Sequence, residues 1–290
     1  MNRRTLLFMP GNNPGMIFSA DVLGADTIIF DLEDAVALDE KDSARTLVRQ
    51  GLKDLEFENS EVCVRINPTD SPYWQKDLDE ILQENLDTIM IPKANVESVQ
   101  MIQEYIDNKN ISKDFKESLQ YILLIESPLD LLHLEDICKG CKNLSGIALG
   151  GEDYSSSLGV QRTKGSKELE YARYVIATVG KAYGIDAIDT PYTDVEDEEG
   201  LLEELALAKT IGLNGSLVIG PRLIDIINNE FSPTEEEIEE AKIILELNEN
   251  AKKEGLGVFS YRGKMVDRPV ILRAENTISS AKNWGLYYEE

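Results

Sequence analysis

Short apolar runs alternate with longer stretches of helical periodicity over about the first 220 residues of the chain. Each run is rich in Ile, Leu and Val, and successive runs typically start about 25–35 residues apart. The runs are Thr5–Met9, Thr27–Phe30, Glu61–Ile66, Thr88–Ile91, Tyr121–Ile125, Ser145–Leu149, Asp186–Ile188 and Gly215–Ile219. Eight alternating strand and helix units predict a (β/α)8 TIM barrel, with an open doubly wound parallel sheet as the alternative. The short and mixed seventh run is the weakest strand of the set.

The last part of the chain follows a different pattern. Ser232-Pro-Thr-Glu235 has the order of a serine N-cap, a first-turn proline and a capping glutamate, and it predicts a long acidic helix to about Lys253. A strand-like GVFSYRG and a last helix, Leu272–Trp284, come after it. We therefore predict a barrel domain over residues 1–230 and a helical extension over 231–290 that contributes to an active-site mouth, its own or a neighbour's.

The chain is strongly acidic, with 54 Asp and Glu against 29 Lys and Arg and a net charge of −25, which disfavours nucleic acid as a partner. No apolar run approaches the length of a membrane span, and Thr5–Met9 is too short for the core of a signal peptide. With only three cysteines, these features predict a cytoplasmic protein.

Two motifs that could carry chemistry are better explained as structure. Cys138-Lys-Gly-Cys141 lacks the further ligands of a zinc site and falls where a helix closes, at Gly140. The single histidine, His133, lies among leucines at helical spacing, which disfavours mechanisms that need a catalytic histidine.

Acidic residues concentrate directly after the predicted strands, where parallel α/β folds place their chemistry. Glu126 follows the fifth run, and Glu152 and Asp153 follow the sixth, one β/α unit later. Asp31, Glu33, Asp34 and Asp189 occupy equivalent positions at other strand ends. So many carboxylates around one mouth would repel one another unless a cation neutralised them, and oxygen ligands favour Mg²⁺ or Mn²⁺ over Zn²⁺.

Two other features of the predicted mouth suit an anionic substrate. Arg65 lies near the end of the third strand, where its guanidinium could form a structural ion pair or hold a substrate carboxylate. Gly150 and Gly151 would let backbone N–H groups approach a ligand anion closely.

Ten motifs in register resemble the HpcH/HpaI aldolase and citrate lyase β-like family, which includes malyl-CoA and citramalyl-CoA lyases. They are RRTLLFMPGNNPGM, GADTIIFDLEDAVALDEKDSAR, VRINP, IPKA, LLIESPLDLL, ALGGEDY, ELEYAR, IDAIDTPYTDVEDEEG, FSPTEEEIEEA and GVFSYRGKMVDRPV. The resemblance covers essentially the whole chain. MPGNNP and DLEDAVALDEKD are more similar to the citrate lyase β branch than to the CoA-dependent branches.

The resemblance implies a Mg²⁺-dependent carbon–carbon lyase that cleaves a citryl thioester on an acyl carrier protein to oxaloacetate and an acetyl thioester. It also implies a homo-oligomer that works with an acyl-carrier subunit and an acyl-transferase subunit. A stand-alone malyl-CoA or citramalyl-CoA lyase and a catalytically inactive scaffold subunit are the alternatives.

Carried over by motif, the resemblance also implies roles for individual residues. Glu126 and Asp153 would bind the metal, Glu126, Arg65 and Gly151 would contact substrate, and Asp267 would act as the acid or base. Glu33 and Asp34 would lie around the waters of the metal. The chain departs from the family pattern after the eighth strand, at Ser216, Gly220 and Leu223, a segment expected on the rim near the thioester arm or a partner subunit.

Overall fold

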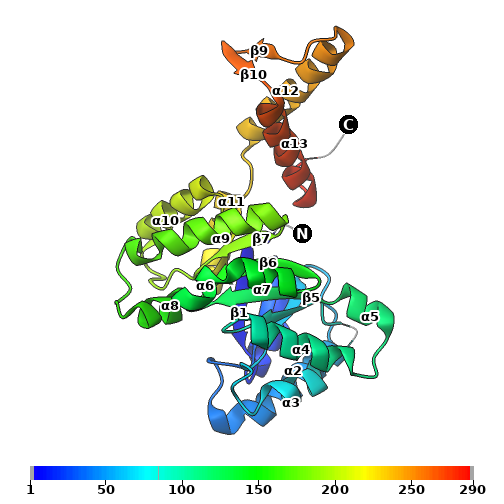
Figure 1. Ribbon diagram of the computed structural model, residues 1–290, viewed down its shortest axis with the longest axis vertical. Coiled ribbons are helices and arrows are strands. Elements are labelled where there is room, and N and C mark those ends of the chain that lie inside the picture. The colour runs from blue at the N-terminus through cyan, green and yellow to red at the C-terminus, as the bar shows by residue number, and fades with distance from the viewer. Residues whose placement is uncertain (1–2, 84, 288–290) are drawn as a thin grey trace. The chain divides into compact units, whose positions relative to one another are not determined.

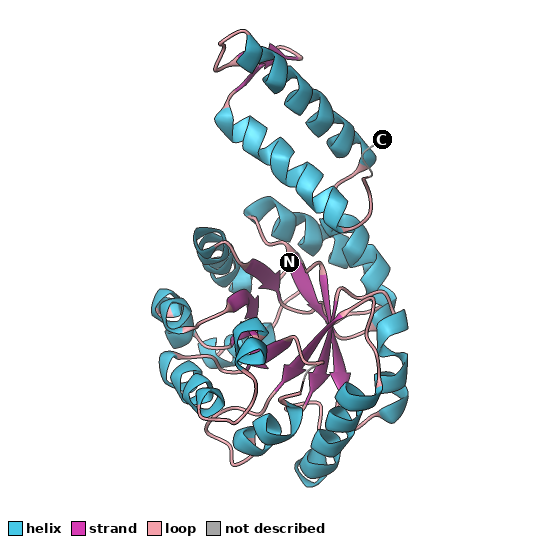
Figure 2. Ribbon diagram, turned by 90° about the vertical axis from the view of Figure 1, so that its right-hand side faces the viewer, coloured by secondary structure: helices cyan, strands magenta, loops and turns pink. Residues whose placement is uncertain are grey.

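The eight apolar runs form eight parallel strands that close into a barrel, in a computed structural model that describes residues 3–83 and 85–287. The strands are β1 (Thr5–Pro10), β2 (Thr27–Asp31), β3 (Glu61–Arg65), β4 (Thr88–Ile91), β5 (Gln120–Ile125), β6 (Leu144–Leu149), β7 (Asp186–Asp189) and β8 (Gly215–Val218). Each strand pairs with the next along the chain, and β8 pairs with β1 to close the barrel. Figure 2 shows the strands with helices around them. The predicted barrel is confirmed, and the open sheet is excluded.

Helices follow the strands in the order expected of β/α units (Figure 1). They are α1 (Pro14–Ser19), α2 (Lys41–Asp54), α3 (Trp74–Ile81), α4 (Val96–Asp107), α5 (Lys113–Ser118), α6 (Pro128–Leu132), α7 (Leu134–Gly140), α8 (Gly151–Leu158), α9 (Glu170–Tyr183), α10 (Glu198–Ile211) and α11 (Ile224–Phe231). Short 3-10 turns occur at η1 (Ala20–Val22), η2 (Leu38–Glu40), η3 (Lys167–Leu169) and η4 (Pro221–Leu223). None of the helices in the described ranges is long and apolar enough to cross a membrane.

The barrel interior is a closed apolar core to which every strand contributes. Its members are Leu6, Ile29, Cys63, Met90, Ile122, Leu124, Ala148, Ile188 and Leu217, with Phe8 packed against them. Cys63, the cysteine outside the Cys138–Cys141 pair, is therefore a core residue. Because the interior is filled with side chains, ligands have access only at the ends of the barrel.

Helix α9 shows how the sequence sets the distance between helix and strand. Its buried side chains include Ala172, Ile176 and Ala177, which recur at helical spacing. A side chain at Gly180 would place its Cβ 2.8 Å from the Cβ of Ala187 in β7. Glycine at this position therefore lets α9 lie close against the barrel.

The chain divides into two compact units, one from Arg3 to Asn228 and one from Asn229 onward. The second unit contains α12 (Glu235–Lys253), the hairpin of β9 (Phe259–Tyr261) and β10 (Lys264–Val266), and α13 (Arg268–Asn283). Its own core includes Ala241, Ile244, Val266, Ile271 and Ala274. Contribution of this unit to an active-site mouth stays a prediction.

Two sequence predictions for this second unit need correction. The N-cap of α12 is Thr234 rather than Ser232, and its capping box is closed by Glu237. Helix α13 begins at Arg268, four residues before the predicted start, because a proline is tolerated in the first turn of a helix.

Candidate active site

A pocket of about 360 Å³ lies where the barrel strands end. Its walls combine acidic, glycine and apolar residues, which come from seven of the eight strands and the loops that follow them. They are Phe8, Asp31, Asp34, Ala35, Arg65, Leu124, Glu126, Gly150, Gly151, Glu152, Asp153, Thr190, Pro191, Leu217 and Ile219. The structure therefore brings together most of the predicted strand-end residues at one mouth.

Glu126 follows β5 directly and is only 5% exposed. Its Oε2 accepts a hydrogen bond of 2.6 Å from the backbone N–H of Lys93, which follows β4 with a positive φ of 46°. Burial, followed by the negative charge of Glu33, raises the pKa of Glu126 to about 8, although the Lys93 amide and the charge of Arg65 lower it. Glu126 is thus a buried carboxylate with too little positive charge around it.

The two glycines after β6 make room for this carboxylate. A Cβ at Gly150 would overlap the Cγ of Glu126, so only glycine fits there without displacing Glu126. Gly151 begins α8, and its N–H donates to Thr190 Oγ1 at 3.1 Å. An anion at this amide would have to replace Thr190, and the predicted substrate contact of Gly151 stays a prediction.

Helix α8 places Asp153 at the pocket in its first turn, where the partial positive charge of the helix favours a carboxylate. Both Asp153 and its neighbour Glu152 are exposed. Glu152 Oε1 lies 3.2 Å from Arg162 Nη1, so one of the two acids is already paired.

Arg65, at the end of β3, forms a buried ion pair with Asp31. Its Nε lies 2.7 Å from Asp31 Oδ1, and its Nη2 lies 2.5 Å from Asp31 Oδ2. Its guanidinium also lies 4.6 Å from the centre of the Phe8 ring, which fixes the plane of the group. The structural role considered for Arg65 is therefore present, and its remaining nitrogen, Nη1, lies on the side of Glu33.

Glu33 is the second buried carboxylate with a raised pKa at this mouth. Its Oε2 lies 3.2 Å from Arg65 Nη1 but has no hydrogen-bond partner among the residues that the structure describes. Burial raises the pKa of Glu33 to about 7 against the lowering effect of Arg65. Asp34 is exposed and lines the pocket.

These carboxylates suit a divalent cation with few protein ligands. Within residues 3–83 and 85–287, no group of three or more His, Cys, Asp or Glu side chains is arranged to hold a metal ion. Mg²⁺ commonly uses one or two carboxylates and completes its octahedron with water and substrate oxygens. The raised pKa of Glu126 and the unpartnered oxygen of Glu33 are the features that such a cation would relieve.

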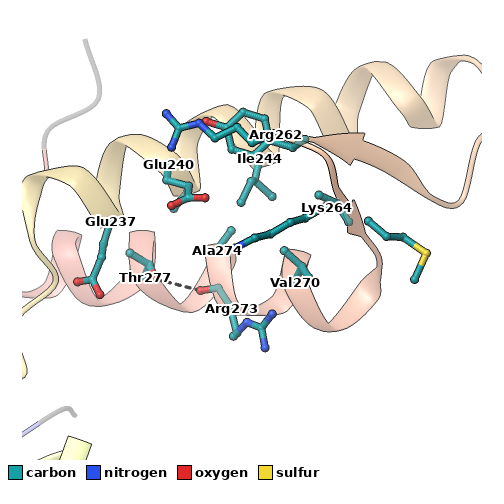
Figure 3. Close-up of a pocket in the computed structure, with 13 residues that line it drawn as sticks. Glu237, Glu240, Ile244, Arg262, Lys264, Val270, Arg273, Ala274 and Thr277 are labelled. Carbon is teal, nitrogen blue, oxygen red and sulfur yellow. Dashed lines mark hydrogen bonds between the residues drawn. The ribbon is translucent and has the colours of Figure 1, made fainter. Parts of the chain in front are cut away.

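Asp267 belongs to the second unit, where it precedes α13 without a capping hydrogen bond from its side chain. It is half-buried. This unit has a pocket of its own, about 600 Å³ in volume, between α12, the β9–β10 hairpin and α13. Figure 3 shows Glu237 and Glu240 of α12 on one side of it and Arg273 and Thr277 of α13 on the other.

Three of the strand-end expectations change in the structure. Asp189 is not a mouth carboxylate, because it binds Arg173 of α9 at 2.8 Å and is buried there. Ser216 and Leu223 are buried too, so they do not form an accessible rim. Gly220 is half-buried, the least enclosed of these departures.

Sequence reasoning missed Arg162 and Thr190, which lie behind the Gly151 turn. Thr190 directly follows β7, so its position at a strand end could have identified it. Arg162 lies in a loop after α8, where no periodicity marks its side chain as part of a site.

This chain has the architecture of a barrel enzyme: its carboxylates, an arginine and a pocket lie together at the carboxyl ends of the strands of a (β/α)8 barrel. Comparison with known proteins identifies the class of enzyme. The family model HpcH/HpaI aldolase/citrate lyase matches residues 4–221. The chain belongs to this family, and it is a lyase.

Relatives in this family align with nearly the whole chain. "Citrate lyase subunit beta" of Leuconostoc mesenteroides subsp. cremoris is 41% identical and covers 96% of this chain and 93% of its own length. Human "Citramalyl-CoA lyase, mitochondrial" is 31% identical, and the alignment covers 96% of this chain and 85% of the human protein. The structure of protein CitE from Mycobacterium tuberculosis in complex with magnesium, acetoacetate and coenzyme A superimposes on this chain with a TM-score of 0.76. The two sequences are 27% identical, and the match covers 97% of this chain and 98% of the CitE chain.

Proposed function

We propose that this lyase cleaves a citryl thioester to oxaloacetate and an acetyl thioester, with Mg²⁺ at the barrel mouth. The observation that carries the proposal is the buried, under-neutralised carboxylate of Glu126 in a pocket that also contains Arg65 and Asp153. The 41% identity to a citrate lyase β subunit over 96% of the chain favours citryl among the substrates of the family.

Glu126 and Asp153 would hold the metal, and Glu33 and Asp34 would accept hydrogen bonds from water around it. When bound, Mg²⁺ supplies Lewis acidity and a template for the substrate hydroxyl and an adjacent carboxylate. The magnesium in the similar CitE complex supports this choice of cation, with Mn²⁺ as the alternative. Oxygen ligands of this kind suit both ions.

Arg65 would hold the carboxylate of the oxaloacetate portion. Asp31 occupies the edge of the guanidinium formed by Nε and Nη2, so substrate would bind at Nη1, where it would share the nitrogen with Glu33 Oε2 at 3.2 Å. Pairing with Asp31 and stacking on Phe8 fix the guanidinium before substrate arrives, so little conformational entropy is lost on binding. Gly151 would contribute by its lack of a side chain at the pocket wall.

Cleavage breaks the bond between the carbinol carbon and the acetyl methylene carbon. The tertiary hydroxyl gives its proton to water at the mouth as the carbonyl of oxaloacetate forms, and the electron pair of the broken bond passes to the acetyl thioester as an enolate. Asp267 would donate the proton that converts this enolate to the acetyl product. For that step Asp267 must reach a mouth, either of its own barrel or of a neighbour's.

The same relationship supports a complex with other citrate lyase subunits. We infer an acyl-carrier subunit with a phosphopantetheine-type arm, an acyl-transferase subunit and a homo-oligomer of this chain. A cytoplasmic location fits such an assembly.

A stand-alone malyl-CoA or citramalyl-CoA lyase is the second candidate, favoured by the 31% identity to human citramalyl-CoA lyase. A side-by-side turnover assay with citryl-carrier protein, citryl-CoA, malyl-CoA and citramalyl-CoA, with and without Mg²⁺, separates the candidates. We expect Mg²⁺-dependent release of oxaloacetate from the citryl substrates. Preferred cleavage of either other CoA ester would replace the citryl assignment. Failure of the well-folded protein to cleave any of them would favour a scaffold subunit.

A further inference from the structure

The loop that follows α8 returns to the mouth and is locked there by a buried serine. Ser166 is 1% exposed and has a positive φ of 44°, a backbone conformation that non-glycine residues seldom adopt. Its hydroxyl accepts a hydrogen bond of 3.1 Å from Arg162 Nη2 and donates one of 2.7 Å to Glu204 Oε1. The serine thus ties Arg162 to helix α10.

From Glu204 the contacts continue through the barrel wall to the end of β7. Glu204 Oε2 accepts from Arg173 Nη2 at 2.6 Å, and Arg173 Nε donates to Asp189 Oδ1 at 2.8 Å. The same oxygen of Asp189 accepts from the N–H of Thr190 at 2.8 Å. Buried charges in such a network are held in fixed positions because each is paired.

Arg162 and Thr190 meet at the turn that carries Asp153. Arg162 Nη1 lies 3.5 Å from Thr190 Oγ1 and 3.2 Å from Glu152 Oε1. A Cβ at Gly151 would lie 2.5 Å from Thr190 Oγ1 and 2.7 Å from Arg162 Nη1, so both side chains press against this glycine. Thr190 Oγ1 also accepts the N–H of Gly151 at 3.1 Å.

We propose that Arg162 is a positioning residue of the metal site, which acts through Thr190 and Glu152 on the turn from Gly151 to Asp153. The inference rests on the proposed function, in which Asp153 is a metal ligand. Arg162 fixes the start of α8, and its charge offsets that of Glu152, the acid next to the ligand. Partners that orient a metal ligand typically contribute about 10–100-fold to metal affinity.

A purely structural role would have a different signature. An ion-pair network that only stabilises the fold would lower the melting temperature when cut and leave the metal affinity of the folded protein unchanged. A positioning role changes the dissociation constant for Mg²⁺ itself, and the contacts that act as one unit give non-additive effects.

The test measures Mg²⁺ binding by isothermal titration calorimetry on the full chain, below the melting temperature of every variant. We expect Arg162→Met and Thr190→Val each to raise the Kd for Mg²⁺ by about 10–100-fold. The double variant should resemble the weaker-binding single variant rather than the product of the two effects. Arg162→Lys should fall between Arg162→Met and wild type, since lysine keeps the charge but not the planar fork.

Arg49→Met is the matched control, because Arg49 pairs with Glu80 at 3.0 Å and is partly exposed on α2, remote in sequence from this turn. Its Kd should equal that of wild type. A folded Arg162→Met protein that binds Mg²⁺ within about twofold of wild type, or strictly multiplicative effects in the double variant, overturns the proposal.

If Arg162→Met does not fold, Arg162→Lys and Thr190→Val decide the question by the same criterion. Lack of Mg²⁺ binding by the wild-type protein would instead remove the proposed metal site, an outcome distinct from equal binding by wild type and variant.

Discussion

The two ends of the barrel bury glutamates in opposite electrostatic states. At the amino ends of the strands, Glu61 accepts from Arg3 Nη2 at 2.7 Å and from Thr27 Oγ1 at 2.7 Å, and it also bonds Arg3 Nε and Thr88. Burial alone would raise the pKa of Glu61, but Arg3 and the threonines lower it. At the carboxyl ends, burial dominates and raises the pKa of Glu126 to about 8.

This difference in pairing distinguishes the amino end of the barrel, where ion pairs stabilise the fold, from the carboxyl end, where the pocket lies. Arg3 also donates to Asp186 Oδ2 at 2.9 Å, so a single arginine connects β3 and β7 at the amino ends of the strands. At the mouth, Arg65 binds Asp31 through two of its nitrogens, and burial raises the pKa of Glu126 and of Glu33 because nearby positive charge does not balance the burial. A cation or a substrate at the mouth would stabilise the charged forms of these two carboxylates.

The largest expected effect comes from removing the under-compensated charge. Glu126→Gln should lower lyase turnover by about 10⁴-fold or more, since loss of the metal removes several kcal/mol of transition-state stabilisation. Circular dichroism should show an unchanged fold, and Mg²⁺ should no longer raise the melting temperature. Glu196→Gln, at an exposed pair with Arg222, is the control and should stay active. Full activity of Glu126→Gln would remove this glutamate from the site.

Replacement of Asp267 tests whether a residue of the second unit takes part in the chemistry at the mouth. Asp267→Asn should retain oxaloacetate binding and lose about 10²–10⁴-fold in turnover, the usual contribution of a general acid. Binding is measured by calorimetry and turnover by release of oxaloacetate. Asp225→Asn, at an exposed position of α11, serves as control. Normal turnover in Asp267→Asn would assign the proton to another group.

At the other end of the barrel, the same kind of change should affect stability instead of chemistry. Arg3→Met leaves Glu61 and Asp186 buried without their partner, which typically costs about 3–5 kcal/mol of folding free energy. Unfolding in urea should show this loss, whereas Arg49→Met, at a partly exposed pair, should cost about 1 kcal/mol or less. If Arg3→Met lost no more folding free energy than this control, the ion pairs of Arg3 would not be what stabilises the amino end of the barrel.

The smallest expected effect is that the contributions of Glu126 and Glu61 to folding stability change with pH in opposite directions. Glu126 has a folded pKa of about 8, above its usual 4.5, so its contribution to stability is full below pH 4.5 and is lost as pH rises through 8. Glu61, with a lowered pKa, contributes above its usual 4.5 and loses that contribution as pH falls.

Melting curves of the metal-free protein from pH 5 to pH 9 test this sign. Glu126→Gln should melt a few degrees above wild type at pH 9, at about 2–4 °C per kcal/mol of relief, and the gap should close toward pH 5. An identical alkaline decline in both proteins would assign the decline to other groups.

The strands and the end of the barrel that carries chemistry follow from the sequence alone. Alternation of Thr88–Ile91 and its counterparts with helical segments is a local pattern, and the first strand residue is within one of the prediction in all eight cases. Glu126 and Asp153 follow adjacent parallel strands, so their common mouth was also predictable. The N-cap of α12 was not, because both Ser232 and Thr234 begin a capping-box pattern and only the folded chain shows which one is used.

Only the tertiary structure decides which buried acids are neutralised. Asp189 and Glu126 both end or follow a barrel strand, and burial raises the pKa of both. Asp189, however, has the guanidinium of Arg173 as its partner, whereas Glu126 accepts a hydrogen bond from the backbone N–H of Lys93. The partners of Glu61 and Asp186 come from Arg3, 58 and 183 residues away. A local pattern places a carboxylate at a strand end, but its charge state depends on burial and on cations that the closed barrel brings from distant parts of the chain.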